Sequence, residues 1–206
     1  MKKKLLLVLV LAALVAGGAF AFDISAGGGV SISNQFGGGV GVGNFKEEFP
    51  WFGFGVFGYF DATYVEASLG LTFAFGKIND DLFYDVSIDT NYTILNLSIL
   101  GKYPISLGDG MTVFPAAGID YQMVLSMSSN GVSWTDANEY MSALWFKFGV
   151  GLDYDLDDSM YLRFLGLYGL RLQNKYESET ISALFNIPNY NMGHGFTLKA
   201  AVGFRF

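Results

Sequence analysis

Residues able to carry out chemistry are scarce in this chain. The sequence contains one histidine and no cysteine. The histidine, His194, lies between Gly193 and Gly195, and no serine stands within two residues of it. A catalytic serine needs a neighbouring base, and the sequence places no such pair around His194. We therefore predict a protein without enzymatic activity.

Patterns that would bind a phosphate or a metal ion are equally weak. The glycine runs at residues 27–29 and 37–39 are not phosphate loops, because no Gly-Lys-Ser/Thr follows either run. Asp80, Asp81 and Asp85 could bind a divalent cation, since oxygen ligands suit calcium. Their spacing matches no calcium-loop pattern, so we predict no metal site and no cofactor.

The composition excludes several classes of protein. Lysine and arginine number 12 against 19 aspartate and glutamate residues, so the basic patches that nucleic-acid binding requires are missing. The absence of cysteine excludes a disulfide framework. Aromatic residues make up 17% of the chain and charged residues 15%, with 27 glycines and 4 prolines. Such a chain is unusual in water, but it is ordinary where lipid receives half of the side chains.

The first 21 residues have the layout of a secretory signal peptide. Three lysines precede an apolar run at residues 5–15, and the small-residue triplet Ala19-Phe20-Ala21 follows. The run is too short for a membrane helix, which needs about 20 apolar residues. We predict cleavage after Ala21 and a single mature domain over residues 22–206.

Eight segments of the mature chain alternate apolar and polar residues: 23–33, 52–60, 64–75, 92–103, 111–123, 143–154, 161–172 and 196–206. Successive side chains of a strand point to opposite faces, so each segment predicts a strand with one apolar and one polar face. Proline removes a ladder donor, so Pro115 is the weakest point of its strand and typical of a strand end or bulge.

The connections between these segments also alternate. Long polar connections at residues 34–51, 76–91, 124–142 and 173–194 follow the odd-numbered segments, and short turns follow the even-numbered ones. This arrangement predicts an all-β fold, a transmembrane up-and-down antiparallel β-barrel of eight strands. Ten strands are the alternative, because residues 36–42 or 180–187 could pair as extra strands within a loop.

Nine charged residues of these segments share the inward, polar parity: Glu66, Lys102, Asp120, Lys147, Asp153, Arg163, Arg171, Lys199 and Arg205. A lysine or arginine facing lipid at the midplane would cost about 2–4 kcal/mol, and no charge falls on the outward parity of a strand interior. An eight-stranded barrel is only wide enough for side chains to fill its interior. We therefore predict an ion network in the lumen, acting as a structural plug or, alternatively, lining a gate or narrow conduction path.

The chain ends in Phe204-Arg205-Phe206, with apolar residues at alternate positions before it. This ending resembles the C-terminal signal, here Phe204 and Phe206, that the barrel assembly machinery reads during insertion. With the export signal and the eight alternating segments, the chain resembles the small eight-stranded outer-membrane β-barrel superfamily that includes OmpX, the membrane domain of OmpA, and OmpW.

The resemblance implies a location in the cell outer membrane and contact with outer-membrane lipid. It also implies loops that serve envelope integrity or surface interaction with an extracellular ligand. The alternative is a small channel, similar to OmpW, for ions or small hydrophobic solutes.

Overall fold

The computed structural model describes residues 23–36, 39–42, 45–48, 50–80, 86–135, 142–172, 189–191 and 193–206. The predicted signal peptide and the segment 180–187 lie outside these residues. In the described part of the chain every regular element is a β-strand. No helix there is long and apolar enough to cross a membrane.

Eight strands form a closed ring. They are β1 (Ile24–Gln35), β4 (Trp51–Ala62), β5 (Val65–Asp80), β6 (Val86–Lys102), β8 (Met111–Ser129), β10 (Ala143–Asp155), β11 (Met160–Arg171) and β13 (His194–Arg205). Each strand pairs antiparallel with the next, and β13 pairs back with β1 from Ser25 opposite Arg205 to Ser33 opposite Thr197. The eight-stranded barrel is thus confirmed. Closure leaves no sheet edge within the ring, as lipid requires.

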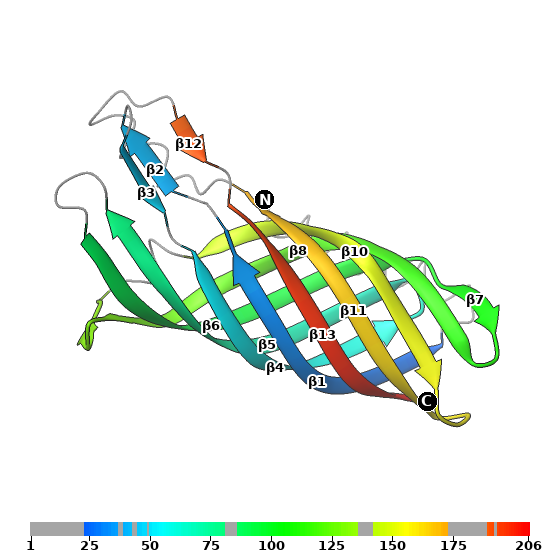
Figure 1. Ribbon diagram of the computed structural model, residues 1–206. Coiled ribbons are helices and arrows are strands. Elements are labelled where there is room, and N and C mark those ends of the chain that lie inside the picture. The colour runs from blue at the N-terminus through cyan, green and yellow to red at the C-terminus, as the bar shows by residue number, and fades with distance from the viewer. Residues whose placement is uncertain are drawn as a thin grey trace, which may run out of the picture.

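Five short strands extend the sheet beyond the ring. At one end, β2 (Gly39–Val42), β3 (Phe45–Glu48) and β12 (Asn189–Asn191) continue from β5 in the order β5-β3-β2-β12. β7 (Ile105–Gly108) and β9 (Val132–Ser133) pair with β8. Figure 1 shows β2, β3 and β12 past one end of the tilted cylinder and β7 and the C-terminus at the other. We call these the long-loop end and the short-turn end. Residues 36–42 therefore do contain an extra strand, but it lies outside the ring, which keeps eight strands.

Three barrel strands are longer than the sequence predicted. β5 continues to Asp80, β6 begins at Val86 and β8 continues to Ser129, so parts of the predicted connections 76–91 and 124–142 are hairpins. Lys77, Asp89 and Asn91 are exposed there, at positions where an apolar residue would continue the alternation. Backbone pairing continues nevertheless, because it needs no apolar side chain. Lys77 and Asp89, directly opposite on β5 and β6, form an exposed ion pair of 3.8 Å.

Pro115 neither ends nor bulges its strand, contrary to the prediction. The last pair between β6 and β8 is Lys102 with Ala116, so Pro115 faces Tyr103, beyond the end of β6. The Tyr103 N–H donates to the Pro115 carbonyl at 3.1 Å. The missing proline N–H thus falls where the β6–β8 ladder has ended. The bulge of this pair lies instead between Thr93 and Ile94.

The two faces of the barrel differ sharply in polarity. On the outer face Val56, Ile99 and Val150 are each more than half exposed, whereas the inward Phe57 and Leu100 are buried. This is the alternation that the sequence predicted. The outer wall is therefore apolar, and the polar and charged side chains of the strands are turned toward the axis.

Candidate functional site

The centre of the lumen near the short-turn end is occupied by Arg163 of β11, which is 2% exposed. Its Nε and Nη2 donate to the two carboxylate oxygens of Asp153, at 2.7 and 2.6 Å, from the directly opposite position on β10. Nη1 donates to Glu66 Oε2 at 2.8 Å, and Nη2 lies 2.6 Å from Asp61 Oδ2. β5, which carries Glu66, stands four places from β11 in the ring of eight. One guanidinium therefore links opposite walls of the barrel.

Aromatic rings enclose the same guanidinium. Its carbon lies 4.7 Å from the ring centre of Tyr59, 5.1 Å from that of Phe114 and 5.2 Å from that of Tyr161. Glycines on the inner face make room for these rings. A Cβ atom at Gly151 would overlap the Phe114 ring, and one at Gly203 would overlap Tyr161. Cation–π attraction thus adds to the ion pairs that hold Arg163.

Asp61 is a member of this group that the sequence analysis missed, because it assigned residues 61–63 to a turn. β4 continues to Ala62, and Asp61 points inward with 2% exposure. Lys102 Nζ donates to Asp61 Oδ2 at 2.5 Å. The signal was available in the sequence, since Asp61 shares the parity of the inward Tyr59.

A second ion pair lies nearer the long-loop end of the lumen. Lys147 Nζ is 2.7 Å from Asp120 Oδ2, and Asp120 Oδ1 accepts a hydrogen bond of 2.6 Å from Ser98. Lys199 lies near them but donates to Ser68 Oγ at 3.0 Å and sits 4.7 Å from the centre of the Phe57 ring.

The two remaining predicted residues lie at the ends of the barrel. Arg205 pairs with Asp155 at 2.5 Å near the short-turn end, where both side chains are about one third exposed. Arg171 is buried toward the long-loop end, beside Trp145 and Tyr92. The nine predicted residues thus lie in separate groups at different distances from the short-turn end.

The part of the lumen nearest the long-loop end is filled by apolar and aromatic side chains. The cluster consists of Trp51, Ala74, Tyr92, Ile94, Val124 and Met127, all buried. Trp51 Nε1 donates to Gln35 Oε1 at 3.0 Å, and Thr90 Oγ1 donates to the Tyr92 hydroxyl at 3.0 Å. A cavity of about 20 Å³ beneath this cluster is large enough for one water molecule.

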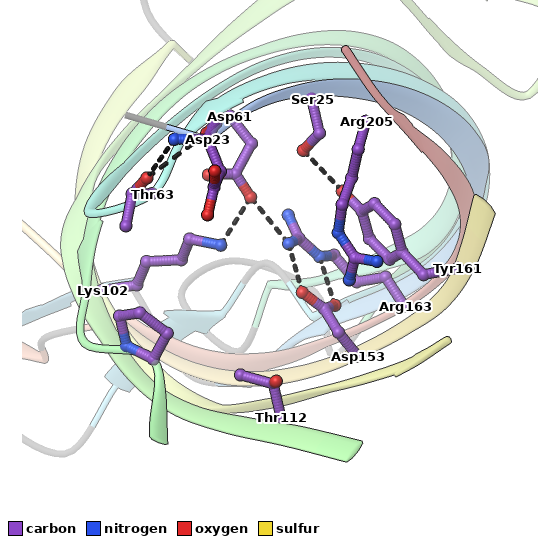
Figure 2. A pocket seen from close by; sticks show the side chains of 11 residues that line it. Asp23, Ser25, Asp61, Thr63, Lys102, Thr112, Asp153, Tyr161, Arg163 and Arg205 are labelled. Carbon is purple, nitrogen blue, oxygen red and sulfur yellow. Dashed lines mark hydrogen bonds and ion pairs between the residues drawn. The ribbon is translucent and has the colours of Figure 1, made fainter. Parts of the chain in front are cut away.

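A larger cavity, of about 140 Å³, opens at the short-turn end. Figure 2 shows Asp61, Lys102, Asp153 and Arg163 around it, with their ion pairs drawn as dashed lines. Between the two cavities lie Leu100, Phe114, Ala116, Leu165 and Leu167, which form a buried apolar cluster.

His194 lies at the long-loop rim, among aromatic side chains. Its Nδ1 is 3.1 Å from the Tyr168 hydroxyl, and its ring packs near Phe36. Among the residues that the structure describes, no group of three or more histidine, aspartate or glutamate side chains could hold a metal ion. The side chains of Asp80, Asp81 and Asp85 lie outside that part.

The closed ring, the apolar outer wall and the charged interior define an integral β-barrel of the bacterial outer membrane. Solved structures of such barrels match the chain. Neisserial surface protein A (NspA) is 10% identical, with 89% of this chain and 97% of that chain covered and a TM-score of 0.50. OprG from Pseudomonas aeruginosa is 9% identical, with 90% and 96% covered and a TM-score of 0.49. The outer membrane protein W of E. coli is 11% identical, with 90% and 98% covered and a TM-score of 0.45.

At these identities the likeness is one of fold. No protein-family model matches the chain, and no curated protein matches its sequence. The small eight-stranded outer-membrane barrel is thus the fold of this chain, and the outer membrane is its location.

Proposed function

We propose that this protein is a non-enzymatic outer-membrane barrel whose lumen is plugged by its own side chains and whose function resides at the long-loop end. The observation that carries the proposal is the Arg163 group, which joins β4, β5, β10 and β11 across the lumen. Arg163, Asp61 and Glu66 are each 2% exposed. A water-filled path would have to separate these pairs.

Energetics favour a plug over a gate. Removing one partner from a buried ion pair typically costs about 3–5 kcal/mol, because the other charge is left uncompensated. Arg163 has three carboxylate partners, and two clusters of buried, mostly apolar side chains fill the lumen between it and the long-loop end. Opening such a lumen would require several of these contacts to break together.

The long-loop end supports a role in surface interaction or envelope integrity. The hairpins β2–β3, β5–β6 and β8–β9 all extend beyond the ring at that end (Figure 1). On the β8–β9 hairpin, Val132 is 67% and Trp134 is 54% exposed. Exposed aromatic and aliphatic residues on a paired hairpin suit contact with an extracellular ligand or a neighbouring envelope component.

Planar-bilayer recording on refolded protein tests the proposal. We expect no discrete conductance steps from the wild-type chain under conditions in which a known porin conducts. Steps that change in size in the Lys147→Ala variant would contradict the plug and favour a small channel. Lipid turnover that disappears in His194→Ala would contradict the absence of enzymatic activity.

We also propose that Phe204 and Phe206 act as the signal for the barrel assembly machinery. Both face outward, with 47% and 86% of their surface exposed, so an insertion factor could reach them. Phe206→Ala should reduce the amount of barrel in the outer membrane without changing the stability of the refolded protein. Equal membrane levels of the variant and the wild type would contradict this role.

A further inference from the structure

A groove of about 440 Å³ crosses the outer wall of the barrel over β1, β13, β11, β10 and β8. The outward residues that line it form two neighbouring rows, in which each member lies directly opposite the next on the adjacent strand. The row nearer the long-loop end is Ile32, Leu198, Gly166 and Val150, and the other row is Val30, Ala200, Phe164, Leu152 and Val113.

Two small residues widen the space between these rows. Gly166 interrupts one row on β11, and Ala200 interrupts the other row on the adjacent β13. Their row neighbours Leu198 and Phe164 are each more than half exposed, so they stand out on either side of the gap. Residues between the rows, such as Lys199, turn their side chains into the lumen, because successive side chains of a strand point to opposite faces. The floor of the groove is therefore the backbone of the wall.

The position and shape of the groove limit what can fill it. The outer wall faces the hydrocarbon of the membrane, so only apolar groups reach it. The groove bends with the wall over five of the eight strands of the ring. A second barrel is a rigid, convex body that contacts such a wall along a narrow band, so it cannot follow this bend. A hydrocarbon chain is thin and flexible enough to do so.

The length of the groove suits one acyl chain. Neighbouring strands lie about 4.8 Å apart, so the four spacings from β8 to β1 make the groove roughly 19 Å long. One leaflet of the hydrocarbon core is about 15 Å thick, half of the total of about 30 Å. A tilted chain from a single leaflet therefore spans the groove. Filling it is favourable, because an empty gap costs the atoms that line it their van der Waals contacts.

One end of the groove lies close to the short-turn end of the barrel. Val113 is the third residue of β8, and Tyr154, the next outward residue after Leu152, stands one residue before β10 ends. The Tyr154 side chain is exposed. Tyrosines are enriched where a membrane meets water. A lipid of that leaflet would have its headgroup beside Tyr154 and its chain along the groove.

We propose that the groove binds one acyl chain of a phospholipid from the leaflet at the short-turn end. The chain fills the space over Gly166 and Ala200, which the side chains of the wall leave open. The barrel thus carries one bound lipid in addition to the exchanging lipids that surround it. This inference concerns the outer wall alone, so its test is independent of whether the lumen is plugged and of what the loops contact.

Native mass spectrometry tests the proposal on protein refolded in detergent and titrated with palmitoyl-oleoyl-phosphatidylethanolamine. We expect the wild type to bind the first lipid about tenfold more tightly than the second, because only the first packs into the groove. Gly166→Leu places a side chain there. A Cβ at this position would lie 3.5 Å from Leu198 Cδ2 and 4.0 Å from the Val150 carbonyl oxygen, so the wall accepts it. This variant should bind the first lipid as weakly as the second.

Gly58→Leu is the matched control. Gly58 is an exposed glycine on the outward face of β4, outside the groove, and a Cβ there would lie 3.7 Å from the Gly27 carbonyl oxygen. This variant should keep the wild-type preference for the first lipid. Ala200→Leu fills the groove from β13 and should abolish the preference, which keeps the test decisive if Gly166→Leu does not refold.

Four results would each overturn the proposal. They are equal affinity for the first and second lipid in the wild type, a preference that persists in either groove variant, loss of the preference in Gly58→Leu, and a wild-type dimer that Gly166→Leu converts to monomers. The last result would assign the groove to a second copy of the chain.

Discussion

Replacement of Arg163 by methionine should destabilise the barrel more than any other single substitution in the lumen. Methionine keeps much of the side-chain volume, so the effect reports chiefly on the lost charge. The substitution leaves Asp61, Glu66 and Asp153 buried, with Lys102 still paired to Asp61.

The expected size of this effect follows from the contacts. Breaking a buried ion pair from one side costs about 3–5 kcal/mol, and Arg163 also loses three ring contacts, so we expect a loss at or above that range. The equilibrium constant for unfolding should therefore rise by roughly two to four orders of magnitude.

Urea unfolding of protein refolded into lipid vesicles, followed by tryptophan fluorescence, measures the difference. Arg205→Met is the matched control, because the Arg205–Asp155 pair is about one third exposed and should contribute about 1 kcal/mol or less. Combining Arg163→Met with Glu66→Gln and Asp153→Asn leaves the Asp61–Lys102 pair intact and should recover more than half of the lost stability. A loss no larger than that of Arg205→Met, or no recovery in the triple variant, would refute the reasoning.

Three further predictions concern the inner wall, the outer wall and a turn. Gly151→Ala should lower the free energy of unfolding in urea by about 1–3 kcal/mol, because the new Cβ would overlap the Phe114 ring in the lumen. An unchanged unfolding midpoint would contradict this steric role. Val150→Lys should cost about 2–4 kcal/mol, since the side chain faces lipid, whereas Val132→Lys on the β8–β9 hairpin should be nearly neutral. Equal effects of the two lysines would argue against a lipid-facing wall. Asp157 accepts hydrogen bonds from the backbone N–H and the hydroxyl of Ser159 and from the Met160 N–H, and these bonds hold its pKa below the usual value. They therefore stabilise the folded state above the pKa that Asp157 has in the unfolded chain. This stabilisation is lost as the pH falls through the pKa of Asp157 in the folded state. Asp157→Asn should therefore lower the unfolding midpoint at pH 7 and leave it unchanged near pH 2; an equal loss at both pH values would rule out this linkage.

The strand faces could be predicted from the sequence because they depend on local geometry. Phe52, Phe54 and Val56 face outward, and Phe57 and Tyr59 face inward, as their parity required. Successive side chains of a strand always point to opposite faces, so a short segment is enough to assign them. The number of strands in the ring followed from counting such segments.

Strand ends were less predictable. A strand is recognised in the sequence by its alternating apolar residues, but in the structure it ends where backbone hydrogen bonding ends. The pattern of apolar residues ends at Phe75, whereas hydrogen-bonded pairing between β5 and β6 continues to Asp80 opposite Val86. The same limit hid Asp61, whose parity was readable but whose position next to a turn suggested a loop.

What the sequence determined by itself is therefore the polarity of each wall, an apolar exterior and a charged interior. Eight alternating segments predicted a ring of eight strands with ten as the alternative, and the structure closes the ring with eight. Only the tertiary structure decided which charges meet. Arg163 reaches Glu66 across the barrel, whereas Lys199 donates to Ser68. The face of a residue is fixed by its own strand, but its height along the axis depends on the register of every pair around the ring. The relative height of two residues on opposite walls depends on the registers of all the strand pairs between them, and the alternation within one strand does not specify those registers.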